Sequence, residues 1–272
     1  MPSWELNRRL ASKFFACLIA IAATISIVPI AIAQQQSWPL PAISGVLGTK
    51  DSSAVTQITA YIQAASATGW HDLKGSGTLT FPAGDTHTAQ LLLLGSCRSR
   101  LDIDLDSGTR SLRIASSAGK FQDEKGNQGS LFPETFSAGI LAFPRLWGEA
   151  LGSPQISLRD DGLFEGTAQT LHRITIEYPY AYSSNGPIPT VATDLYFDPS
   201  SNLLLLSVDN LRVKENPNKL FQRVTSYGNY QLLSGVLFPT TIQQTVDGQP
   251  QWTLQISQVT TNTNPSDSTF EF

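Results

Sequence analysis

Few side chains in this sequence are spaced for acid–base or metal chemistry. The three histidines, His71, His87 and His172, are scattered, and no His-x-x-x-His or Cys-x-x-Cys pair accompanies them. A zinc site needs three or four ligands brought together by the fold, and this spacing does not predict one. The sequence also lacks a Gly-x-Ser-x-Gly nucleophile elbow and a phosphate-binding loop. We therefore expect no metal and no cofactor.

Acidic residues at alternate positions suggest a calcium loop at first sight. Asp102-x-Asp104-x-Asp106 has the oxygen spacing, but such a loop also needs Gly at its sixth position and Glu at its twelfth, where Ser107 and Arg113 lie. The residues that alternate with the aspartates are apolar, which predicts a strand with a solvent-exposed polar face. The pair Asp160-Asp161 precedes a glycine at a predicted turn, where solvated charge is the ordinary explanation.

Cys97 is the remaining candidate nucleophile. It follows a leucine-rich run, and no histidine lies near it in sequence to activate it, so we expect a buried structural thiol. Because no residue stands out for catalysis, we predict that the protein is not an enzyme. A secreted hydrolase on a β-scaffold, working with two separated carboxylates, stays open as an alternative.

The amino terminus has the features of a secretory signal peptide. A stretch with Arg8, Arg9 and Lys13 precedes an apolar run over residues 14–33 that ends in Ala31-Ile-Ala33. This pattern predicts cleavage after Ala33 and export to the periplasm. An uncleaved membrane anchor is the alternative, because the run is close to the ~20 residues that span a bilayer, but the small residues at its end favour cleavage.

The composition agrees with an exported β-protein. Only 15% of the 272 residues are charged, and the formal net charge is −4. A mildly acidic chain without a basic stripe is not expected to bind nucleic acid. We predict an extended leader over residues 34–49 and one domain over residues 50–272.

Hydrophobic periodicity predicts one helix and many strands in this domain. Asp51 offers a helix cap, and the apolar spacing that follows predicts an amphipathic helix over 52–66 whose stripe must lie on a sheet. The stripe consists of Val55, Ile58, Ile62 and Ala65, with Tyr61 beside it. Alternation with period two then predicts strands separated by short turns. Their ranges are 75–81, 86–94, 98–106, 110–114, 155–159, 167–178 and 191 onward, with the polar residues 123–129 interrupting the sheet.

The last quarter of the chain predicts an antiparallel meander. Asp247-Gly248 fits a tight hairpin whose central residues have positive φ. Ile242 and Val246 face one way before this turn, and an alternating apolar set, Trp252, Leu254 and Ile256, is predicted to point inward after it.

Two four-leucine runs, residues 91–94 and 203–206, lie inside predicted strands and need cover on both faces. One explanation is that these leucines pack in an ordinary hydrophobic core. The other is an apolar cavity for acyl chains, in which each buried methylene contributes about 0.8 kcal/mol. The bulky apolar segment 131–147, with a short helix over 134–143, is the candidate lid.

The order of these parts resembles the LolA-like family of periplasmic outer-membrane lipoprotein carriers. The resemblance rests on Gly75-Ser-Gly-Thr-Leu-Thr-Phe81 opening the first meander, and on Asp194-Leu-Tyr-Phe-Asp198 and Pro265-Ser-Asp-Ser-Thr-Phe270 in the second. It implies a mainly β fold with a few helices (α+β), a half-open antiparallel β-barrel with helices covering its mouth. One of four arginines would hold the lid in that family, and the sequence does not distinguish Arg98, Arg100, Arg110 and Arg113.

The same resemblance implies a non-catalytic carrier, a chaperone that shields the acyl chains of lipoproteins or lipids during transport through the periplasm. Inner-membrane release machinery and an outer-membrane acceptor would be its partners. A lipid-sensing or protein-interaction module on the same fold is the alternative. The residues expected to contact lipid are Leu92, Leu94, Leu101, Ile103, Leu105, Phe136, Ile140, Phe143, Leu204, Leu206, Phe238, Trp252, Leu254 and Ile256.

Overall fold

The computed structural model describes residues 47–65, 70–94, 98–115, 118–130, 151–165, 169–179, 190–213 and 216–271. All of them belong to one compact unit that covers residues 35–272. The predicted signal peptide, most of the predicted leader and the predicted lid helix lie outside the described residues. Within the described part of the chain, no helix is long and apolar enough to cross a membrane.

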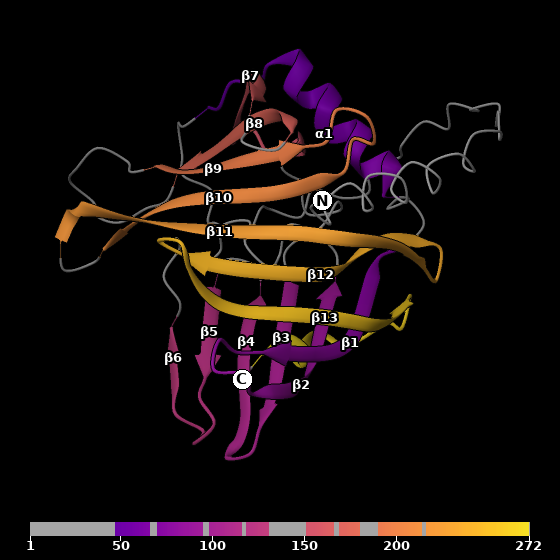
Figure 1. Cartoon of the computed structure of the whole chain (residues 1–272), viewed down its shortest axis with the longest axis vertical. Helices are drawn as coiled ribbons and strands as arrows, with labels where there is room; N and C mark the ends of the chain where they lie inside the picture. The colour runs from indigo at the N-terminus through magenta and orange to yellow at the C-terminus, as the bar shows by residue number, and fades with distance from the viewer. Residues whose placement is uncertain are drawn as a thin grey trace, which may run out of the picture. The chain divides into compact units, whose positions relative to one another are not determined.

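A single antiparallel sheet of 13 strands dominates the unit, in the order β6-β5-β4-β3-β2-β1-β13-β12-β11-β10-β9-β8-β7 (Figure 1). Two meanders meet where β1 pairs with β13, the last strand. The outermost strands are β6 and β7, so the sheet is open. The strands are β1 (Asp72–Thr80), β2 (Thr86–Leu94), β3 (Arg98–Leu105), β4 (Gly108–Ala115), β5 (Ala118–Gln122), β6 (Gln128–Ser130), β7 (Ser157–Glu165), β8 (Thr170–Pro179), β9 (Thr190–Phe197), β10 (Leu204–Val213), β11 (Asn216–Leu233), β12 (Val236–Val246) and β13 (Gln249–Thr261).

The helix α1 (Ser52–Ala64) begins at the predicted cap, Asp51. The Asp51 carboxylate makes no capping bond, and its Oδ2 instead accepts a hydrogen bond of 3.0 Å from the backbone N–H of Asp160 in β7. The cap residue therefore ties the start of the helix to the sheet. Ile58, Tyr61 and Ala65 are buried as predicted, whereas Val55 and Ile62 are only partly buried and Ala54 is buried instead.

The predicted hairpin turn at Asp247-Gly248 is confirmed. Asp247 has φ 48° and Gly248 has φ 75°, the positive values that a tight turn between twisted strands requires. The turn sets the register of β12 and β13, in which Ile242 lies opposite Leu254. Both side chains are fully buried, as the alternation predicts.

The prediction that residues 123–129 interrupt the sheet is wrong. The Asp123 carboxylate accepts hydrogen bonds from the backbone N–H groups of Lys125 (2.9 Å) and Asn127 (2.8 Å), which folds the segment into a turn between β5 and β6. The segment is polar because a turn of this kind is stabilised by side chains that hydrogen-bond to the nearby backbone. Pairing therefore continues from β4 through β5 to the edge strand β6.

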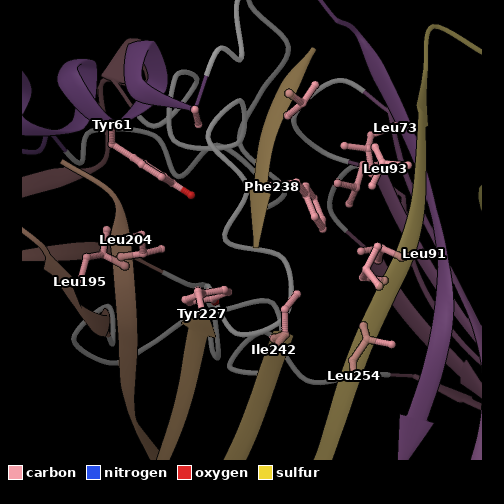
Figure 2. Packing of buried hydrophobic residues seen from close by; sticks show 14 of the residues in the cluster. Tyr61, Leu73, Leu91, Leu93, Leu195, Leu204, Tyr227, Phe238, Ile242 and Leu254 are labelled. Atoms are coloured by element: carbon pink, nitrogen blue, oxygen red, sulfur yellow. The ribbon is translucent and has the colours of Figure 1, made fainter. Parts of the chain in front are cut away.

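The core lies on the sheet face that α1 covers, which we call the inner face. In Figure 2, Tyr61 extends from α1 toward Leu204, while Leu91, Phe238 and Leu254 point into the same interior from other strands. The Tyr61 and Phe197 rings are 5.5 Å apart. Because one cluster joins the helix to both meanders, the predicted open half-barrel with a helix across it is confirmed.

Candidate functional site

The inner face carries a broad apolar wall. Its strand register aligns Leu91 of β2 with Leu101 of β3, and Ile242 of β12 with Leu254 of β13. These side chains and the buried face of α1 form one continuous cluster. Of the residues expected to contact lipid, those buried on this face are Leu101, Ile103, Leu204, Phe238, Leu254 and Ile256, and those partly buried against it are Leu105 and Trp252.

Three expected lipid contacts lie on the opposite, outer face of the sheet. Leu92 is paired with Arg100 and Leu94 with Arg98, whereas Leu91 and Leu93 face the inner cluster. A run of four leucines has no period that shows which pair points inward, so only the register decides it. The third expected contact on the outer face is Leu206. Three more expected lipid contacts lie outside the described residues, namely Phe136, Ile140 and Phe143.

A β-bulge in β10 explains the position of Leu206. Leu204 pairs with Phe197, but Leu206 pairs with Tyr196, so one extra residue of β10 separates the two pairs. Such an insertion reverses which side chains point inward beyond it. Leu204 therefore lies inside and Leu206 outside, and the polar residues Ser207 and Asp209 become fully buried on the inner face.

The buried Asp209 is the centre of a polar group that the sequence analysis missed. Its Oδ1 accepts a hydrogen bond of 2.6 Å from the Thr193 hydroxyl of β9. Its Oδ2 accepts bonds from Arg223 of β11, 2.9 Å from Nε and 2.8 Å from the terminal nitrogen. Burial of two charges is tolerated when they are paired and hydrogen-bonded in this way. No local signal in the sequence indicates it, because regular alternation from Leu204 would place Asp209 on the outer face.

Hydroxyl groups extend this polar group toward the apolar wall. The Ser207 and Tyr227 hydroxyls are 3.3 Å apart, and Tyr230 donates a hydrogen bond of 2.6 Å to the Leu204 carbonyl. Burial raises the pKa of Tyr227 and of Tyr230 well above the ordinary value, so both phenols stay neutral. Thr225 has a fully buried hydroxyl with no hydrogen-bond partner among the described residues. Such a group costs about 1–3 kcal/mol.

A histidine and an aspartate do come together elsewhere, at the contact of α1 with β7 and β8. Nε2 of His172 lies 2.7 Å from Asp160 Oδ1, and its Nδ1 lies 3.0 Å from Gln57 Oε1. Both ring nitrogens are thus engaged by side chains of the protein. The arrangement fastens the helix to the sheet.

The environment of Asp160 supports that fastening role. Burial alone would raise its pKa, but hydrogen bonds from Ser53, His172 and the Gly162 N–H outweigh this and hold the pKa of the carboxyl below its ordinary value. A carboxylate held ionised in this way is a stable acceptor rather than a proton donor. Across the described ranges, no group of three or more His, Cys, Asp or Glu residues could hold a metal ion.

The four candidate lid arginines have other partners in the described part of the chain. Arg98 pairs with Asp267, Arg100 donates a hydrogen bond of 3.0 Å to the Thr269 carbonyl, and Arg113 donates to the Glu271 carbonyl. These contacts hold the 3-10 helix η2 (Asp267–Phe270) on the outer face of β3 and β4. Arg110 instead pairs with Glu124 at 2.9 Å.

These features define an open antiparallel half-barrel whose inner face is apolar, with a buried polar group at one end. The fold is similar to that of a LolA superfamily protein from Nitrosomonas europaea, with a TM-score of 0.54, 11% sequence identity, and coverage of 80% of this chain and 97% of that chain. It is also similar to a DUF1329 family protein from Desulfovibrio piger, with a TM-score of 0.50, 8% identity and the same coverage of 80% and 97%. Comparison of the sequence with protein-family models and with curated proteins finds no match. The protein therefore has a LolA-like fold, which confirms the resemblance.

Proposed function

We propose that the protein is a non-catalytic carrier that binds the acyl chains of lipids or lipoproteins on the inner face of its half-barrel. The single observation that carries this proposal is the apolar wall, to which both meanders contribute. An acyl chain would replace contacts that these side chains now make with one another and with α1. The signal peptide predicted from the sequence supports a location in the periplasm, where the carrier would work between a donor at the inner membrane and an acceptor at the outer membrane.

Binding of a fluorescent fatty-acyl probe to delipidated protein tests the proposal. Saturable binding is expected, with a lipid also visible by native mass spectrometry of protein purified from the periplasm. The variant Ile256→Thr should weaken binding about tenfold, because it replaces an inner-face ethyl group by a hydroxyl that must be desolvated. The matched control is Leu92→Thr on the outer face, for which no change in affinity is expected.

Thermal unfolding of both variants separates loss of the site from loss of the fold. If native mass spectrometry finds no lipid and the probe does not bind wild-type protein, the carrier function is wrong. Equal weakening by the inner-face and outer-face variants would also count against it. Capture of a protein instead of a lipid would then favour an interaction module on the same fold.

A further inference from the structure

The buried polar group continues directly from the apolar wall. Thr225 lies two residues from Tyr227 along β11, and Tyr227 pairs with Ile242 of the wall. Ser207 of β10 is the partner of Thr225 across the strands, and Asp209 is the partner of Arg223. A molecule lying along the inner face would therefore meet apolar side chains at one end and polar side chains at the other.

The polar end carries matched charges. Asp209 and Arg223 are paired at 2.8 Å, and Asp209 is fully buried. An anionic head placed here would meet the Asp209 carboxylate in a poorly solvated environment, and a cationic head would meet the Arg223 guanidinium. Charge matching therefore favours an uncharged ligand.

The Thr225 hydroxyl supplies the hydrogen bond that such a ligand needs. It is fully buried and has no partner among the described residues. A hydroxyl can donate to a carbonyl oxygen, the polar group that an ester or amide places next to an acyl chain. Buried polar groups without a partner are rare, and a ligand atom is one explanation for them.

We propose that the polar end of the inner face recognises the uncharged ester or amide linkage of the acyl ligand, with Thr225 donating a hydrogen bond to its carbonyl oxygen. This inference rests on the proposed carrier function and names its ligand class. The site then prefers acylglyceryl groups, whether free or attached to a lipoprotein, to fatty acids and to anionic phospholipids.

The test compares two probes with the same chain and different heads, 1-palmitoylglycerol and palmitate, by displacement of a fluorescent acyl probe from the full protein. Wild-type protein is expected to bind palmitoylglycerol about tenfold more tightly. The near-isosteric variant Thr225→Val should reduce this preference to about onefold by weakening the binding of palmitoylglycerol. A diacylglyceryl-cysteine peptide, measured in parallel, shows whether the lipoprotein form binds better than the free acylglycerol.

Thr240→Val is the matched control, since this hydroxyl lies on the next strand and already donates a hydrogen bond of 2.7 Å to the Asn229 carbonyl. It should lower stability without changing the ratio of the two affinities. If wild-type protein binds both probes equally, or if Thr225→Val keeps the preference, the head-group site is overturned while the carrier function stands. If neither probe binds, the carrier function itself fails.

Discussion

Gly77 of β1 passes so close to β13 that a Cβ atom built on it would lie 1.8 Å from the carbonyl oxygen of Gln255. This contact sits beside a β-bulge in the pairing that joins the first strand to the last. Glycine is therefore required here by the approach of two backbones, not by its own φ. The junction between the two meanders depends on it.

The variant Gly77→Ala should consequently destabilise the protein by about 2 kcal/mol or more, because neither backbone can move without breaking the β1–β13 ladder. Urea unfolding measures the effect. Gly228→Ala is the control, since a Cβ on Gly228 would meet no atom within 4 Å. Similar losses of stability for the two variants would show that the close approach of the two backbones is not the reason why position 77 needs glycine.

Breaking the buried ion pair should have a larger effect. We expect Arg223→Met to lower the free energy of unfolding by about 3–5 kcal/mol, because it leaves the Asp209 carboxylate buried without its cation. The double variant Asp209→Leu with Arg223→Met should recover much of this loss, since it buries no charge. A double-mutant cycle by chemical denaturation gives the coupling, and additive losses would contradict the pairing.

Asp72 should make stability depend on pH. Burial alone would raise the pKa of this carboxyl, but hydrogen bonds from the Thr263 hydroxyl and from the backbone N–H groups of Thr263 and Asn264 hold it below the ordinary value. A lowered folded-state pKa gives stability that is present above the unfolded-state pKa and is lost as pH falls through the folded-state pKa.

The variant Asp72→Asn should therefore flatten the fall in unfolding free energy as the pH drops below the ordinary pKa of an aspartate. Chemical denaturation at several pH values measures this slope. Asp104→Asn is a suitable comparison, because Asp104 is exposed on the outer face. A slope unchanged from wild type in Asp72→Asn would remove Asp72 as the source of acid sensitivity.

The carboxy-terminal segment should contribute to stability through Phe270, which is 2% exposed under the arginine contacts of η2. Phe270→Ala is expected to cost about 3 kcal/mol because it empties a buried aromatic site. Phe121→Ala, at a side chain that is 38% exposed, should cost much less. Hydrogen exchange should also increase in β3 and β4 of the Phe270 variant. Unchanged exchange there would mean that the segment does not cover these strands.

Local sequence patterns were sufficient for most elements of the fold. The period-two alternation of residues 98–105 corresponds to β3, and Asp247-Gly248 forms the expected turn. Both depend on interactions between residues close in sequence. The turn between β5 and β6 was missed because its polar residues resemble a loop until the Asp123 hydrogen bonds are known.

The candidate site depended on information that no local pattern contains. Among four consecutive leucines, the register with β1 and β3 decided that Leu91 and Leu93 point inward. The bulge after Leu204 decided that Asp209 is buried beside Thr193 and Arg223, residues from two other strands.

By itself, the sequence determined most of the strands, the amphipathic helix and the apolar character of the meander, because these follow from side-chain period and turn chemistry along one segment. Only the tertiary structure decided which side of each strand faces α1 and where the polar end of the inner face lies. The reason is physical. One inserted residue in a strand reverses which side chains beyond it point inward, and backbone pairing between distant segments determines where that insertion lies.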